Sequence, residues 1–155
     1  MIGLDAASYI ILGLATGLVT ALVTVRLALR RFRSERMWEK KVQTYSDIFD
    51  ALFHLKNHAE VQLKHFEEGV QFDVKYLKDV GDRATVSYNA IRKAALIGTF
   101  ILSNEAAARL SALVVSFDHP NLDGDIVEEL SADLQAVDGT VADLRPIAKK
   151  DLQQS

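Results

Sequence analysis

An uncharged apolar run, YIILGLATGLVTALVTV, extends from Tyr9 to Val25. A helix from Ser8 to Val25 rises by about 1.5 Å per residue and is roughly 27 Å long, close to the roughly 30 Å hydrocarbon core of a bilayer. Residues 27–29, beyond Arg26, are also apolar and can extend it. The run therefore predicts a transmembrane helix over residues 8–29, preceded by a short extracytoplasmic lead over residues 1–7.

Five arginines lie near the end of this segment: Arg26, Arg30, Arg31, Arg33 and Arg36. Residues 26–41 carry seven basic and two acidic residues, a net charge of +5, although the whole chain carries −3. Positive charge collects on the cytoplasmic side of a membrane helix and attracts anionic headgroups. We therefore expect these arginines to contact lipid headgroups, with the N-terminus outside and residues 30–155 in the cytoplasm.

Two other interpretations of the apolar run remain open. The run could be a buried helix of a soluble protein, or the apolar part of a cleaved signal peptide. A signal peptide has its positive charge before the apolar part. Residues 1–8 contain no Lys or Arg, so a retained anchor fits the charge order better.

Small residues recur every four positions in the predicted span, at Gly13, Gly17 and Ala21. This spacing puts them on one face of a helix, where two backbones can approach closely. The pattern predicts self-association of the anchor and a homo-oligomer. Glycine and alanine are also common in membrane helices that make no such contact, which leaves the alternative open.

The chain after the anchor has room for one small domain with a modest core. Its apolar residues recur at intervals of three and four, and no segment alternates with a period of two, which predicts an all-α fold. We expect a single N-terminal transmembrane helix that continues into a cytoplasmic antiparallel bundle of about four helices, at residues 30–68, 73–102, 104–117 and 126–152. The absence of cysteine excludes disulfides, thiolate metal sites and a cysteine nucleophile.

The expected helix boundaries come from capping residues and helix breakers. Three residues are suited to the N-cap position: Asp73, Ser103 and Asp125. Gly69 is suited to end the first helix, and Pro146 should kink or fray the last turns of the fourth. The segment 94–102 is apolar on all sides, so we expect it to be the most deeply buried part of the domain.

Three histidines, His54, His58 and His65, lie close to one line along the first helix of the domain, at i, i+4 and i+11. Three imidazoles could bind zinc or iron. This line is roughly opposite the apolar stripe of the helix, so it should face solvent or a protein partner instead of a core where ligands converge. A metal site is therefore kept only as an alternative.

No stretch of the chain carries a recognisable catalytic or cofactor motif. There is no G-x-S-x-G, no phosphate-binding glycine loop and no Glu-x-x-His pair of the di-iron bundles. The segment 119–130 fails as a calcium loop, because His119 and Leu130 occupy positions that need carboxylates. We expect no cofactor and no enzymatic activity, and the acidic balance after residue 41 disfavours nucleic acid as a partner.

Residues 31–41, Arg-Phe-Arg-Ser-Glu-Arg-Met-Trp-Glu-Lys-Lys, are followed by Tyr45. They resemble the motif Arg-Phe-x-Ser-Glu-x-x-Trp-Glu-x-Lys of an uncharacterised bacterial family of small single-pass membrane proteins. The resemblance extends to Leu102-Ser103 and to residues 148–152. It implies a single-pass topology in a bacterial inner membrane, without a particular activity or site. Trp38 is suited either to helix packing below the headgroups or to contact with a protein partner.

Together these features predict a non-enzymatic, membrane-anchored helical interaction module that oligomerises and recruits or regulates a protein partner at the inner membrane. Trp38 and the histidine face are the candidate contacts for that partner. One alternative is a small subunit or sensor of a larger membrane complex, such as a stress or phage-defence system. A second alternative is a metal-binding helical protein that uses His54, His58 and His65.

Overall fold

The computed structural model describes residues 3–118 and 125–153, except for the side chains of residues 3–16, 18 and 19. These residues form α1 (Gly3–Phe66), α2 (Val74–Ile97), the 3-10 helix η1 (Gly98–Phe100), α3 (Asn104–Asp118) and α4 (Ile126–Gln153). No strand occurs in the described ranges, and the predicted all-α fold is confirmed. The chain divides into two compact units, Met1–Trp38 and Glu39–Ser155.

The first unit consists of the N-terminal part of α1. The described side chains from Thr20 to Trp38 are exposed, and some of them interact along the helix. Arg31 Nε forms an ion pair with Glu35 Oε1 at 2.9 Å, and the Arg36 guanidinium lies 4.7 Å from the centre of the Phe32 ring. Contacts of this kind, one helical turn apart, each stabilise a helix by a few tenths of a kcal/mol.

Within the part of the chain whose side chains are described, no helix combines the length and the apolar character needed to cross a bilayer. The predicted span over residues 8–29 falls partly outside that part, because the side chains of residues 8–16, 18 and 19 are not described.

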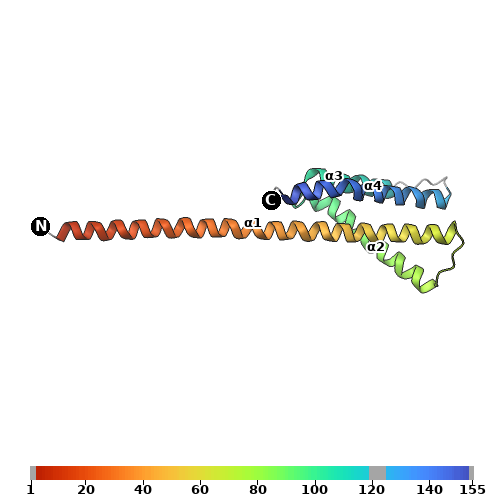
Figure 1. The fold of residues 1–155 in the computed structure, drawn as a ribbon, viewed down its shortest axis with the longest axis horizontal. Helices are drawn as coiled ribbons and strands as arrows, with labels where there is room; N and C mark the ends of the chain where they lie inside the picture. The colour runs from red at the N-terminus through yellow and green to blue at the C-terminus, as the bar shows by residue number, and fades with distance from the viewer. Residues whose placement is uncertain (1–2, 119–124, 154–155) are drawn as a thin grey trace. The chain divides into compact units, whose positions relative to one another are not determined.

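The second unit is a helical bundle in which α1 from residue 39 on, α2, α3 and α4 alternate in direction (Figure 1). One hydrophobic core joins all four helices. Its most deeply buried large side chains are Leu52 of α1, Ile91 of α2, Leu110 of α3, and Val137 and Leu144 of α4. All five belong to the residues whose spacing of three and four predicts amphipathic helices, so the expected helical bundle is confirmed.

The expected helix ends are also found. The Asp73 carboxylate accepts hydrogen bonds from the backbone N–H groups of Lys75 and Tyr76, at 2.8 and 3.3 Å, and so caps α2. Ser103 and Asp125 cap α3 and α4 in the same way, through longer bonds of 3.4 Å each. Gly69 follows the end of α1 with φ of 68°, a left-handed conformation that favours glycine. The fourth helix continues past Pro146 to Gln153.

The segment 94–102 differs from expectation. The predicted helix 73–102 ends at Ile97, and the following 3-10 turn changes the direction in which the side chains point. Leu96 is 74% exposed and Phe100 is 83% exposed, so the prediction that this segment is the most buried part was wrong. Only one side of an element at the edge of a bundle can face the core, and here Gly98 and Leu102 occupy that side.

Candidate functional site

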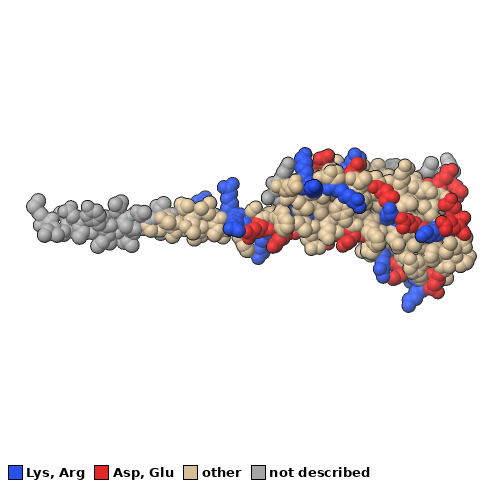
Figure 2. Space-filling model, in the orientation of Figure 1, with Lys and Arg blue, Asp and Glu red and all other residues tan. Residues whose placement is uncertain are grey.

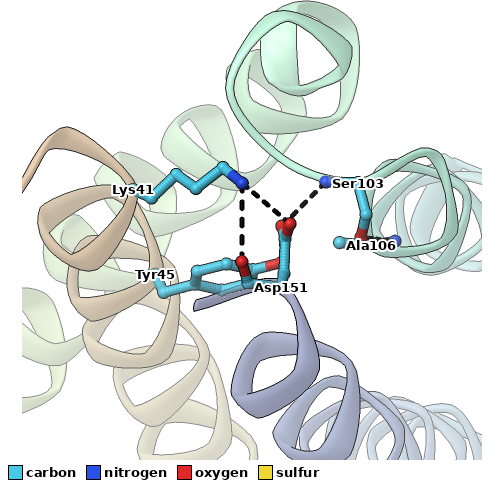
Figure 3. A network of polar contacts seen from close by, with 5 residues as sticks. All are labelled: Lys41, Tyr45, Ser103, Ala106 and Asp151. Carbon is cyan, nitrogen blue, oxygen red and sulfur yellow. Dashed lines mark hydrogen bonds and ion pairs between the residues drawn. The ribbon is translucent and has the colours of Figure 1, made fainter. Parts of the chain in front are cut away.

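Four residues from three parts of the bundle meet around the carboxylate of Asp151, and we call them the Asp151 cluster (Figure 3). Lys41 Nζ of α1 donates to Asp151 Oδ1 at 2.9 Å, and the Tyr45 hydroxyl, one turn further along α1, donates to Oδ2 at 2.8 Å. The backbone N–H of Ser103, just before α3, also donates to Oδ2, at 2.9 Å. The cluster therefore links α1, the start of α3 and the end of α4.

The cluster is largely shielded from solvent. The side chains of Lys41 and Asp151 are only 19% and 11% exposed. Burial by itself raises the pKa of Asp151, but the hydrogen bonds from Lys41, Tyr45 and Ser103 outweigh it and leave the pKa below its ordinary value. Burial and the hydrogen bond to Asp151 raise the pKa of Tyr45 strongly. The carboxylate is thus ionised and well supplied with donors, as in a structural ion pair.

The sequence contains a signal for this cluster, which the spacing of apolar residues does not reveal by itself. Lys41 lies four residues before Tyr45, and Asp151 lies three residues after Ala148, so each charge continues the apolar stripe of its own helix. A lysine and an aspartate on the buried sides of two different helices are costly unless they pair. The segments quoted for the family resemblance, around Lys41 and Tyr45, Ser103 and Asp151, are the ones that meet here.

A second polar site is a cavity of about 340 Å³ that is open to solvent and lined by side chains from all four helices. We call it the Asp133 cavity. Its lining residues are Leu55, His58, Ala59, Ala84, Thr85, Tyr88, Phe117, Asp118, Asp133 and Val137. The aliphatic residues come from the core, whereas the histidine and the two aspartates bring titratable groups to the same space.

Burial is the main cause of the pKa shifts of Asp133 and His58 in this cavity. Burial, and next the negative charge of Glu129, raise the pKa of Asp133 to about 6. Burial lowers the pKa of His58, so its imidazole is neutral at pH 7. The Tyr88 hydroxyl donates a short hydrogen bond to Asp118, which raises the pKa of Tyr88. Asp151 forms an ion pair with Lys41, whereas among the described residues no Lys or Arg side chain forms an ion pair with Asp133.

The three histidines do not share one environment. His58 lines the Asp133 cavity, so the prediction that it faces away from the bundle was wrong. His65 Nδ1 donates to the Val70 carbonyl at 2.9 Å, where it closes the end of α1, and His54 packs edge-on against Phe53. Among the described residues, no group of three or more His, Cys, Asp or Glu is placed to hold a metal ion.

The remaining predicted site residues lie in the first unit. Trp38 is 44% exposed, and the five arginines from Arg26 to Arg36 are exposed. Gly17 and Ala21 are also exposed, and a Cβ added at Gly17 would meet nothing within 4 Å. Gly13 lies outside the residues whose side chains are described. The anchor contact and the lipid contact therefore stay predictions.

Comparison with known proteins gives no relative on which to base a function. No model of a protein family matches the chain, and neither a curated protein nor a solved structure matches it.

Proposed function

We propose that this protein is a non-enzymatic interaction module, in which an N-terminal helix anchors a helical bundle to the inner membrane and the bundle recruits or regulates a protein partner. The observation that carries the proposal is the exposure of three large apolar side chains close together in the sequence, Leu96, Ile97 and Phe100, which we call the η1 surface. These side chains are 74%, 45% and 83% exposed.

The η1 surface has the properties of a contact for another protein. Large apolar side chains that cluster on the surface of a domain with a complete core mark an interaction site more often than isolated ones do. The surface is held in place, because the N–H of Ser103, three residues after Phe100, donates to the largely shielded carboxylate of Asp151. A preorganised apolar surface loses little conformational entropy when a partner binds.

Membrane anchoring is supported by the sequence pattern. The apolar run from Tyr9 to Val25 is followed by a segment with a net charge of +5, the order found in an anchor with its C-terminal side in the cytoplasm. The arginines of this segment are exposed and therefore free to reach headgroups. A reporter fused after Ser155 should be active only in the cytoplasm, and activity of the fusion in the periplasm would refute this orientation.

The partner contact can be tested by placing a photo-crosslinking amino acid at Phe100 in the full-length chain in cells. We expect one discrete covalent adduct, because the side chain at this position is the most exposed of the η1 surface. The matched control is Val86, which is 70% exposed on another part of α2. Leu96→Asp should abolish the adduct at position 100, because it places a charge in the apolar contact. Equal labelling from positions 86 and 100 would refute a specific contact.

Self-association through the anchor is a separate part of the proposal. Gly17→Ile places a branched side chain where two helix backbones would approach, and it should shift detergent-solubilised protein from an oligomer to a monomer. Leu18→Ile serves as the control on another face of the helix. An oligomer that survives Gly17→Ile would move the contact to a different part of the chain.

The alternative function as a small subunit or sensor of a larger membrane complex is favoured by one observation, the Asp133 cavity. A cavity that is bounded by all four helices is a position from which a bound molecule can change their packing.

A further inference from the structure

We infer that the Asp133 cavity binds a small organic cation, an amine or quaternary ammonium with a short apolar body, between the two carboxylates and the two aromatic rings that line it. This inference concerns the second unit alone. It does not depend on the membrane anchor or on a partner at the η1 surface.

The size and the apolar lining of the cavity fit a small ligand. A volume of about 340 Å³ is near the lower limit of ligand-binding pockets. Leu55 and Ala59 of α1, Ala84 of α2 and Val137 of α4 supply aliphatic surface. Burying such a surface against the methylene or methyl groups of a ligand is favourable, whereas a bare ion offers no apolar surface for this contact.

The charges around the cavity select a cation. Asp118 ends α3 and Asp133 lies on α4, and the part of the chain that the structure describes places no Lys or Arg in the cavity lining. His58 is neutral at pH 7, because burial lowers its pKa. Arg92 of α2 is near enough to lower the pKa of Tyr88 slightly, but it does not line the cavity. Glu129 adds a further negative charge beside Asp133.

Two aromatic rings give the cavity a second means of recognising a cation. The rings of Tyr88 and Phe117 lie 5.9 Å apart with an angle of 57° between their planes, and both line the cavity. The face of an aromatic ring attracts an ammonium group, more strongly when water is partly excluded. The hydrogen bond from Tyr88 to Asp118 fixes one ring relative to one carboxylate.

The surrounding surface adds to this preference. Figure 2 shows acidic side chains gathered over the end of the second unit where α1 ends and α4 begins. The acidic residues at these helix ends are Glu67, Glu68, Asp125, Glu128 and Glu129. Negative potential over the end of a bundle raises the local concentration of cations and speeds their binding.

Calorimetric titration of the full-length protein in a maltoside detergent with choline tests the inference. Choline combines a quaternary ammonium group with a body small enough for the cavity, and we expect a dissociation constant of about 1 mM or lower. The comparison ligand is 3,3-dimethyl-1-butanol, which has nearly the same shape without the charge. It should bind at least about tenfold more weakly, because it cannot interact with the carboxylates.

Three variants locate the binding. Asp133→Asn should weaken choline binding about tenfold, and Phe117→Leu about threefold through loss of an aromatic face. Glu128→Gln removes an exposed charge from the same helix outside the cavity and should leave the affinity within about twofold. Circular dichroism confirms that each variant keeps its helical content.

Three outcomes would overturn the inference. Absence of heat with millimolar choline would exclude the site. Equal binding of the uncharged analogue would show an apolar cavity without selection for charge. Equal weakening by Asp133→Asn and Glu128→Gln would show nonspecific attraction to the acidic surface.

Discussion

The Asp151 cluster and the Asp133 cavity both place an aspartate of α4 between helices of the same bundle, yet the pKa values of the two aspartates are shifted in opposite directions. The pKa of Asp151 lies below its ordinary value, whereas that of Asp133 rises to about 6. Burial by itself raises the pKa of both carboxyl groups. The difference is that Asp151 receives three hydrogen bonds to its carboxylate, while Asp133 has Glu129 as its charged neighbour.

The comparison separates two uses of a polar residue in a bundle. When hydrogen-bond donors of the protein itself occupy the oxygens of a carboxylate, the carboxylate helps to specify which helices pair. Few acceptor positions then remain for a ligand. A carboxylate that is partly buried without such donors lowers the stability of the fold and keeps its capacity to bind a cation. The predictions below test this division, in order of expected effect.

The largest effect is expected from Asp151→Ala. This change leaves the Lys41 ammonium, the Tyr45 hydroxyl and the Ser103 N–H without their shared acceptor, and loss of one member of a buried pair costs about 3 kcal/mol. The measurement is thermal unfolding of a fragment of residues 35–155, followed by circular dichroism. Because the folded pKa of Asp151 is depressed, its contribution is present above the ordinary value of 3.8 and is lost as the pH falls through the folded value. The destabilisation should therefore shrink in strong acid.

In contrast, Asp133→Asn is expected to stabilise the fragment at pH 7.5. A pKa raised from 3.8 to about 6 corresponds to about 3 kcal/mol of unfavourable free energy for the ionised group, and screening at a half-buried carboxyl reduces this to about 1–2 kcal/mol. Because the folded pKa is raised, the stabilising effect of the native carboxyl is present below 3.8 and is lost as the pH rises through about 6. The variant should thus exceed the native fragment in melting temperature at pH 7.5 and match it near pH 4. A variant that is less stable at pH 7.5 would contradict the comparison.

Tyr45→Phe is expected to lower the free energy of unfolding by a smaller amount, about 1 kcal/mol. The change removes one hydroxyl donor at 2.8 Å from Asp151 and keeps the buried ring, while Lys41 and Ser103 still serve the carboxylate. Urea unfolding of the fragment gives the difference. Tyr76→Phe is the control, because Tyr76 is 44% exposed, and it should have no measurable effect.

The smallest effect is expected from Asp143→Asn. Arg109 of α3 and Asp143 of α4 form an ion pair at 3.1 Å, but their side chains are 53% and 44% exposed. An exposed pair of this kind contributes about 0.5 kcal/mol, and added salt should remove it. A loss close to that of Asp151→Ala would show that burial is not what distinguishes the Asp151 cluster.

The repeating part of the fold was predictable from the sequence, because amphipathic periodicity and capping residues act locally. Asp73 and Ser103 cap helices wherever those helices pack, and Leu52 and Leu110 mark the buried side of their own helices. The exposed Phe100 was not predictable in this way. When a segment is apolar on every side, its sequence has no amphipathic pattern from which the side that faces the core can be predicted.

The candidate sites were less predictable, because they depend on which helices become neighbours. The histidine line along α1 was predicted to face away from the bundle, which was wrong for His58. Its position in the same cavity as Asp133 of α4 follows from the packing of the bundle. The Asp151 cluster carried a clearer signal, since charges that continue apolar stripes at Lys41 and Asp151 require partners.

The Asp151 cluster also bears on the order in which the bundle folds. Lys41 and Asp151 are 110 residues apart in the sequence, whereas each helix of the bundle is joined to the next by a short connection. Closing the longer loop costs more chain entropy, so we expect contacts between consecutive helices to form first and the contact between α1 and α4 in the cluster to form later. Changes in the cluster should then speed unfolding and leave the refolding rate nearly unchanged in stopped-flow experiments. The cluster would set the lifetime of the folded bundle rather than the rate at which it forms.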